Sequence, residues 1–150
     1  MCEQLIKAVK FGVLSSSLEH QDVWEHIKSV EDQEAARKLL RENGLVAFVI
    51  NGAILPRASG AKDTVLKSGG VPFKSPPSLE VSLQLPHRGE VRGMGLRSGI
   101  SLIVGGGYHG KTTLLEALQV GVYNHVPGDG REFVVSLEAS VKVDRKKINA

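Results

Sequence analysis

An eight-residue run, Gly105-Gly106-Gly107-Tyr108-His109-Gly110-Lys111-Thr112, constrains this chain more than any other feature. It fits the phosphate-binding pattern of Gly, four residues, Gly-Lys and then Ser or Thr. Glycines let backbone amides approach phosphate oxygens, and the following helix directs its positive dipole end at them. Lys111 would contact the terminal phosphates, and the Thr112 hydroxyl would be the Mg²⁺ ligand. The predicted nucleotide-binding residues are Gly105, Gly106, Gly107, Tyr108, His109, Gly110, Lys111, Thr112 and Thr113.

The residues on both sides of this run give the context that the pattern requires. Residues 101–104 are an apolar run that predicts a buried parallel strand ending at the first glycine. After Lys111, apolar residues at helical spacing predict a helix that closes near Gly121. The alternative is a glycine-rich turn that binds nothing, but strand, loop and helix follow each other in the required order.

Composition sets wide limits. The chain has 150 residues and an apolar fraction of 41%, which suits one soluble domain. Its longest apolar run, residues 45–50, is too short to cross a membrane, so we expect a soluble intracellular protein with no membrane partner and leave the compartment open. A single cysteine, Cys2, excludes an internal disulfide framework and a cysteine-rich zinc site. The net charge of +3 is weak support for anionic ligands.

Helical periodicity dominates the first third of the chain. Residues 2–14 have one apolar face, and Ser17 is the predicted N-cap of a second helix. Trp24 is expected to anchor that helix in the core. The same spacing continues over residues 31–43, so the two stretches are either one bent helix or two.

Strand patterns follow. Residues 45–50 predict a buried strand, and the loop after it carries Arg57, whose charge is expected to face water. Strict alternation over residues 79–85 predicts a half-buried antiparallel strand, with residues 90–94 as its hairpin partner. A further apolar strand is predicted at residues 133–135.

Glycine, proline and serine recur between the two groups of strands, which predicts a linker. We therefore divide the chain into a helical and strand unit at residues 1–60, a linker at 61–78 and a partial nucleotide-binding domain at 79–150.

Several segments together resemble the predicted ATPases of the ABC class. The resemblance covers roughly residues 30 to 135, and its most specific part is the Tyr-His pair inside the glycine-rich loop. It also rests on the segments at residues 44–49, 54–60, 71–76, 103–115 and 121–132. Thr112 stands where many relatives have Ser, and both supply the hydroxyl that Mg²⁺ needs.

The resemblance implies a fold class, ligands and partners. The fold is α/β: a helical N-terminal unit, then the start of a P-loop domain of ABC type with an antiparallel hairpin layer and an incomplete parallel sheet. ATP and Mg²⁺ are the implied ligands. RNA is a partner of some relatives, and a homodimer through the nucleotide site is implied for a full-length protein.

Other segments that ATP hydrolysis needs are absent from the sequence. No apolar strand after Phe133 ends in an Asp-Glu pair, and residues 141–144 are a poor imitation of one. Residues 96–100 resemble a signature segment only superficially. We therefore expect the N-terminal part of a longer ATPase, with no catalytic residue in this chain and negligible turnover by it alone.

Two alternatives remain open. A nucleic-acid-binding or scaffolding module with a vestigial loop would need seven cations on one face: Arg57, Lys62, Lys67, Lys74, Arg88, Arg92 and Arg97. A GTPase is weaker, because no Asn-Lys-x-Asp segment is present.

Three single residues also have two interpretations each. Tyr108 would either stack on a partner or shield the phosphates, and the His109 side chain is expected to face solvent. Phe73 is expected in the core rather than on adenine. Asp129 and Arg131 have no role that the sequence reveals.

Overall fold

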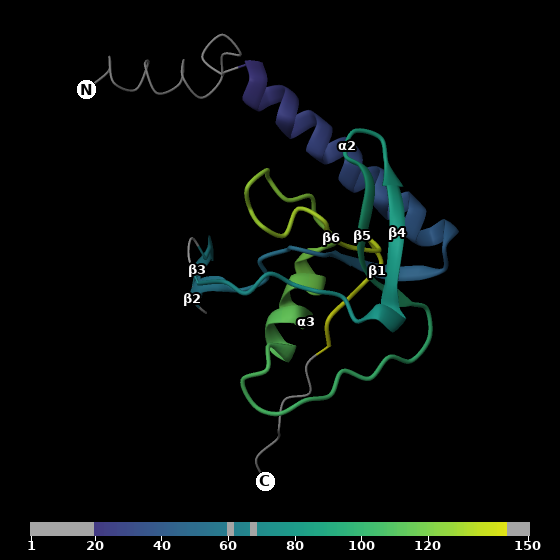
Figure 1. Ribbon diagram of the computed structural model, residues 1–150, viewed down its shortest axis with the longest axis vertical. Coiled ribbons are helices and arrows are strands. Elements are labelled where there is room, and N and C mark those ends of the chain that lie inside the picture. The colour runs from purple at the N-terminus through teal and green to yellow at the C-terminus, as the bar shows by residue number, and fades with distance from the viewer. Residues whose placement is uncertain (1–19, 60–61, 67–68, 144–150) are drawn as a thin grey trace, which may run out of the picture.

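The computed structural model describes residues 20–59, 62–66 and 69–143. A four-stranded sheet with the order β4-β5-β1-β6 forms its centre (Figure 1). The strands are β1 (Leu45–Ile50), β4 (Glu80–Leu85), β5 (Gly89–Arg97) and β6 (Val134–Ser136). A second sheet pairs β2 (Arg57–Ser59) with β3 (Lys62–Val65), and a 3-10 turn spans Pro77–Leu79. The helices are α2 (His20–Glu42) and α3 (Lys111–Val120).

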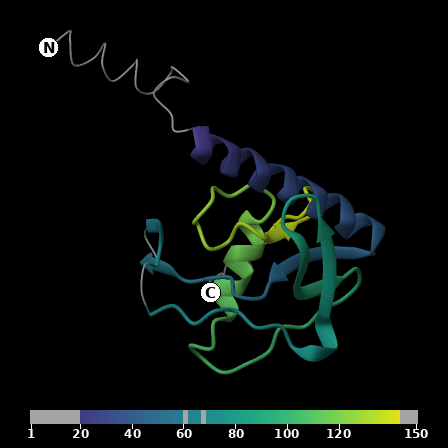
Figure 2. The same cartoon turned by 45° about the horizontal axis from the view of Figure 1, so that its top comes forward.

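The two helices cover opposite faces of the sheet, because each side of β1 is buried in a different hydrophobic cluster. Phe48 faces α2 and packs in a cluster with Ala36 and Leu40 of that helix. Its neighbour Val49 faces the other way and packs in a cluster with Ala117 of α3. Side chains alternate along a strand, so a continuous apolar run such as β1 fits a strand buried on both faces. Figure 2 shows α2 and α3 lying apart on the two sides of the strands.

A close approach between β1 and β5 explains one glycine. Gly93 pairs with Ile50 in the antiparallel register. A Cβ at Gly93 would lie 2.2 Å from the Val49 carbonyl oxygen and 2.7 Å from the Phe48 ring. Only glycine therefore lets β5 pass this close to the central strand.

The predicted strands at residues 45–50, 79–85, 90–94 and 133–135 are confirmed, and the two predicted helical stretches are one continuous helix, α2. The mixed α/β class and the antiparallel hairpin layer are confirmed as well. The expected helix at residues 2–14 and the N-cap at Ser17 lie outside the described residues.

Three expectations differ from the structure. Every strand pair among the described residues is antiparallel, so no parallel pairing is present there. The predicted strand at residues 101–104 is not formed, and Leu102 and Val104 are 83% and 75% exposed, because no described strand lies beside them to supply backbone partners. Trp24 is not a core anchor, since it is 60% exposed and the buried residues of α2 begin at Asp32.

The expected linker contributes to the core. Phe73 packs against the cluster that contains Val49, which confirms the core assignment. Two backbone hydrogen bonds join Phe73 to the turn after β1. The Phe73 oxygen accepts the Gly52 N–H at 2.8 Å, and the Phe73 N–H donates to the Ala53 oxygen at 2.8 Å. The division into three units stays a prediction. In the sheet, β1 from the first predicted unit lies between β5 and β6, which belong to the third.

Candidate phosphate-binding site

The glycine-rich loop lies between β5 and α3. In Figure 1 it follows the long green connection along the bottom of the molecule, and α3 begins where it ends. Gly110 is the N-cap residue of α3 in a left-handed conformation with φ of +76°, which L side chains adopt only with strain. Its carbonyl accepts the Leu114 N–H at 2.9 Å, so the first helical turn is formed. The earlier N–H groups of the helix lack intrahelical acceptors and carry the positive end of the dipole.

The far end of α3 is fixed to the sheet, and this holds the loop in place. Ser136 of β6 donates its hydroxyl to the Leu118 oxygen at 2.7 Å and its N–H to the Gly121 oxygen at 2.9 Å. Ala117 of α3 is fully buried, in the hydrophobic cluster that contains Val134 of β6. A Cβ at Gly121 would lie 2.8 Å from the Val134 oxygen, so only glycine allows this contact.

The Lys111 ammonium folds back over the start of the loop. Its Nζ donates to the Gly105 oxygen at 2.7 Å and to the Gly106 oxygen at 2.5 Å. An ammonium has three donors and no acceptor, so two carbonyls leave one donor for another oxygen. The Lys111 ammonium therefore lies beside the first two glycines of the loop, at the N-terminal end of α3.

Tyr108 and His109 differ in how they lie. Tyr108 has a φ of +63° although it is not glycine, and its side chain is fully exposed. A left-handed backbone costs a non-glycine residue roughly 1–2 kcal/mol. His109 is exposed as expected, and its ring lies close to the backbone of Gly106. A Cβ at Gly106 would be only 2.8 Å from the ring atoms Cε1 and Nδ1. Gly106 thus leaves the room that this imidazole occupies.

Thr112 and Thr113 follow the lysine on the first turn of α3. The Thr112 side chain is exposed, and its hydroxyl makes no hydrogen bond within the described residues, whereas Thr113 is half-buried. Those residues also contain no group of three or more His, Cys, Asp or Glu placed to hold a metal ion. Mg²⁺ binds with few protein ligands and completes its octahedron with waters and phosphate oxygens, so a single hydroxyl fits this ion.

The loop that follows α3 contains a buried polar cluster that the sequence interpretation missed. Arg57 donates to the Asp129 side chain at 2.8 Å and to its backbone oxygen at 3.0 Å. His125 Nδ1 lies 2.8 Å from the same carboxylate. The side chains of Arg57, Asp129 and His125 are only 9%, 12% and 11% exposed, respectively. The expectation that Arg57 faces water is therefore wrong, because a carboxylate 72 residues away pairs with it.

Further contacts tie this loop to the rest of the fold. Gln33 of α2 is fully buried, accepts the His125 N–H at 2.8 Å and donates to the His125 oxygen at 2.9 Å. Arg131 is also buried and donates through Nε and Nη2 to the Leu55 oxygen. Asp129 and Arg131, which had no assignable role, thus shape the loop by binding the segment after β1.

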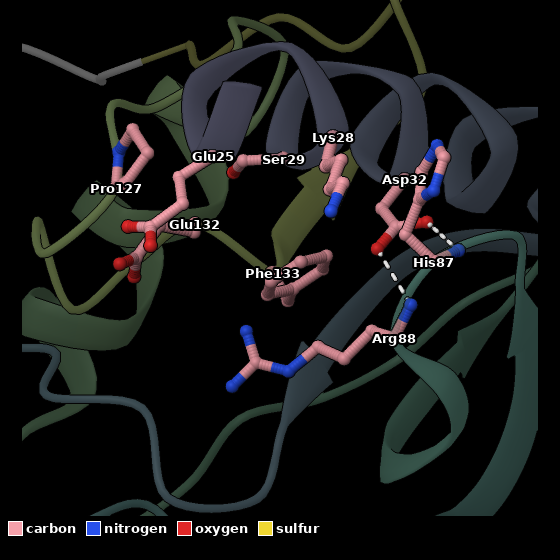
Figure 3. Close-up of a pocket in the computed structure, with 9 residues that line it drawn as sticks. All are labelled: Glu25, Lys28, Ser29, Asp32, His87, Arg88, Pro127, Glu132 and Phe133. Carbon is pink, nitrogen blue, oxygen red and sulfur yellow. Dashed lines mark hydrogen bonds between the residues drawn. The ribbon is translucent and has the colours of Figure 1, made fainter. Parts of the chain in front are cut away.

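A separate cleft of about 280 Å³ lies where α2 meets this loop and the β4–β5 turn (Figure 3). Asp32 accepts the backbone N–H groups of His87 at 2.8 Å and Arg88 at 3.0 Å, which fixes the turn to the helix. The Arg88 guanidinium lies 4.7 Å from the centre of the Phe133 ring. The lining also includes Glu25 and Glu132, so charges of both signs face the cleft. None of its lining residues belongs to the glycine-rich loop.

Comparison with known proteins places the loop in a family. The family model of the ABC_ATPase P-loop domain matches residues 19–149, which is most of the chain. The chain belongs to the ABC_ATPase family. This membership agrees with the sequence resemblance and assigns nucleotide binding at the level of the family.

A relative of this ABC_ATPase chain is the uncharacterized protein MJ1628 of Methanocaldococcus jannaschii. The two are 33% identical over 127 residues, which cover 77% of this chain and 27% of the relative. The chain thus spans about a quarter of that protein's length. No helix in the described part of this ABC_ATPase chain is both long and apolar enough to cross a bilayer.

Proposed function

We propose that this chain binds Mg-ATP through residues 105–113. The observation that carries the proposal is the Lys111 ammonium, which lies between the Gly105 and Gly106 carbonyls at the positive end of α3. A triphosphate needs this combination of a point charge, backbone amides and a helix N-terminus. The family assignment supports the proposal at the level of nucleotide binding.

Within this proposal each part of the loop has a separate task. The Lys111 ammonium binds oxygens of the terminal phosphates, and the amides of the loop surround them. The exposed hydroxyl of Thr112 is the protein ligand of Mg²⁺. The bound ion would neutralise the phosphate charge. Tyr108 lies fully in solvent, so it is available to an external partner.

We further propose that hydrolysis by this chain alone is negligible. Phosphoryl transfer needs acidic groups that hold the metal shell and orient water. The sequence after Phe133 contains no apolar strand that ends in an Asp-Glu pair. Completion of the site by a second copy within a longer protein stays a prediction.

Ligand-induced stabilisation tests the binding proposal. At a ligand concentration of 100 times Kd, a ligand that binds only the folded state stabilises it by about 2.7 kcal/mol. For a domain of this size, that raises the midpoint of thermal unfolding by roughly 5–10 °C. Mg-ATP should produce this rise in the native chain, while Lys111→Ala should abolish it.

The matched control is Lys38→Ala, which removes one exposed lysine from α2. It should keep the full response to Mg-ATP. An equal response in Lys111→Ala and Lys38→Ala, with both variants folded by circular dichroism, would exclude the assignment. A turnover assay on the same samples should show no lysine-dependent release of phosphate.

The nucleic-acid alternative needs cations that converge on one face, and the described cations do not support it. Arg57 is in the buried pair with Asp129, and Arg88 lies over Phe133. Arg92 lies 3.4 Å from Glu90. Among the residues that the structure describes, no contact favours RNA binding over nucleotide binding, so RNA remains only a prediction from the resemblance.

A further inference from the structure

Two dipeptides of the chain, Asn43-Gly44 and Asn51-Gly52, have the sequence that favours spontaneous deamidation. In this reaction the backbone nitrogen of the glycine attacks the side-chain Cγ of the asparagine, and its proton leaves with the departing ammonia. Water then opens the cyclic imide that remains, which gives aspartate or isoaspartate. Glycine favours the attack because it has no Cβ beside the attacking nitrogen. The fold decides which dipeptide reacts, because hydrogen bonds to this nitrogen or to the side-chain amide oppose the attack.

The fold holds Asn51-Gly52 at every group that takes part. The Asn51 side-chain nitrogen donates to Glu80 Oε2 at 3.0 Å, and its Oδ1 accepts the Ser75 N–H at 2.6 Å. The attacking nitrogen, that of Gly52, donates to the Phe73 oxygen at 2.8 Å. The Phe73 side chain in turn packs against the core. Attack at Asn51 therefore requires that the segment with Phe73 and Ser75 separates from the turn after β1.

The fold holds Asn43-Gly44 only through the last turn of α2. Asn43 is exposed, and its side-chain nitrogen donates to the Leu39 oxygen at 2.8 Å. Within the described residues, its Oδ1 accepts no hydrogen bond. The Gly44 nitrogen donates to the Arg41 oxygen at 3.3 Å, which is longer than the usual range of about 2.7–3.2 Å. Helix ends fray, so these bonds open without the separation of any strand pair.

We propose that Asn43 is a site of spontaneous deamidation in the folded chain, and that the hydrogen bonds of Asn51 and Gly52 protect the second dipeptide. The reason is the size of the opening that each reaction needs. Fraying of a helix end costs almost no free energy, whereas the opening of a core segment costs up to the free energy of global unfolding. The folded chain therefore presents a reactive conformation at Asn43 far more often than at Asn51.

The two products differ in what they do to the fold. A carboxylate at residue 43 cannot donate to the Leu39 oxygen, and it lies at the C-terminal end of α2, where the helix dipole disfavours negative charge. Isoaspartate also adds a methylene to the backbone between α2 and β1. A carboxylate at residue 51 would face the Glu80 carboxylate in place of the present hydrogen bond. Deamidation thus weakens the end of a helix at the first site, and at the second it places two like charges in contact.

Peptide mapping measures both sites in one fragment. Trypsin releases residues 42–57, which contain both dipeptides, and tandem mass spectrometry locates the replacement of NH₂ by OH. The native chain is incubated in alkaline buffer, with circular dichroism to show that it stays folded. Asn43 should then convert roughly tenfold faster than Asn51, or more. In concentrated urea the two rates should be similar, because both asparagines precede glycine.

A pair of glutamate variants tests the source of the protection. Glu80→Ala removes the acceptor of the Asn51 amide, so it should accelerate the conversion of Asn51 by about threefold or more and leave that of Asn43 unchanged. Glu116→Ala carries the same change on α3 and should alter neither rate. Both glutamates are exposed, so neither change is expected to unfold the chain.

Four results would each overturn the proposal. The first two are conversion of Asn51 in the folded chain at least as fast as that of Asn43, and no conversion of Asn43 in the folded chain under conditions where it converts in urea. The third is the same ratio of the two rates in the folded and unfolded chain, which would show that the neighbouring sequence sets the rates. The fourth is a Glu80→Ala chain in which Asn51 converts as slowly as in the native chain.

Discussion

Removing the Asp129 carboxylate should destabilise the fold far more than removing a carboxylate from a surface ion pair. In Asp129→Ala, the Arg57 guanidinium loses its ion pair with this carboxylate while its side chain stays about nine-tenths buried. Breaking a buried ion pair on one side costs about 3–5 kcal/mol. Arg57 keeps its bond to the backbone oxygen of residue 129, which favours the lower end of that range. His125 also loses its contact with the carboxylate. We expect a loss of about 3 kcal/mol in the free energy of unfolding.

The pair between Arg41 and Glu138 supplies the control. It has the short N–O distance of 3.0 Å, but the two side chains are 58% and 64% exposed. Exposed ion pairs contribute about 0–1 kcal/mol, so Glu138→Ala should change little. In urea unfolding followed by circular dichroism, a slope of about 2 kcal/mol per M places the Asp129→Ala midpoint roughly 1.5 M lower. Equal midpoints for the two variants would refute the burial argument.

Two further predictions concern pH and the surface of α2. Hydrogen bonds from Ser75 and Asn51 hold the pKa of Glu80 below its ordinary value of 4.5. Its stabilising contribution is thus complete above pH 4.5 and is lost as the pH falls through the lowered pKa, so Glu80→Gln should lose less stability than the native chain between pH 7 and about pH 3. An equal loss in urea titrations at the two pH values would contradict this. The exposed Trp24 is the chain's single tryptophan, so acrylamide should quench its fluorescence almost as strongly in the folded chain as in urea; strong protection would show that α2 packs differently.

Local patterns were enough to predict most of the sheet. The continuous apolar run at residues 45–50 is typical of a strand buried on both faces, and the alternation at residues 79–85 is typical of a strand buried on one face. Each pattern predicts its strand without information about distant residues. The short motif that contains Gly110 and Lys111 predicts the nucleotide-binding residues, and this assignment stays a prediction. Their positions in the structure agree with the pattern: Gly110 is left-handed, and Lys111 contacts the first glycines.

Features that depend on distant partners could not be predicted. Residues 101–104 have the composition of a strand, but a strand also needs a neighbour, and none lies beside them among the described residues. Trp24 has helical spacing, yet the buried residues of α2 begin only at Asp32. Arg57 looked like a solvated loop charge because Asp129 is 72 residues away in sequence. In each case the missing information is which segments lie side by side.

The most direct test of the central claim is a calorimetric titration of the native chain and Lys111→Ala with Mg-ATP. The account predicts saturable binding with one site per chain for the native protein and for Lys38→Ala. It predicts no measurable heat of binding for a folded Lys111→Ala, because the charge between the Gly105 and Gly106 carbonyls is then missing. Binding of equal affinity in Lys111→Ala, or no binding by the folded native chain, would contradict it.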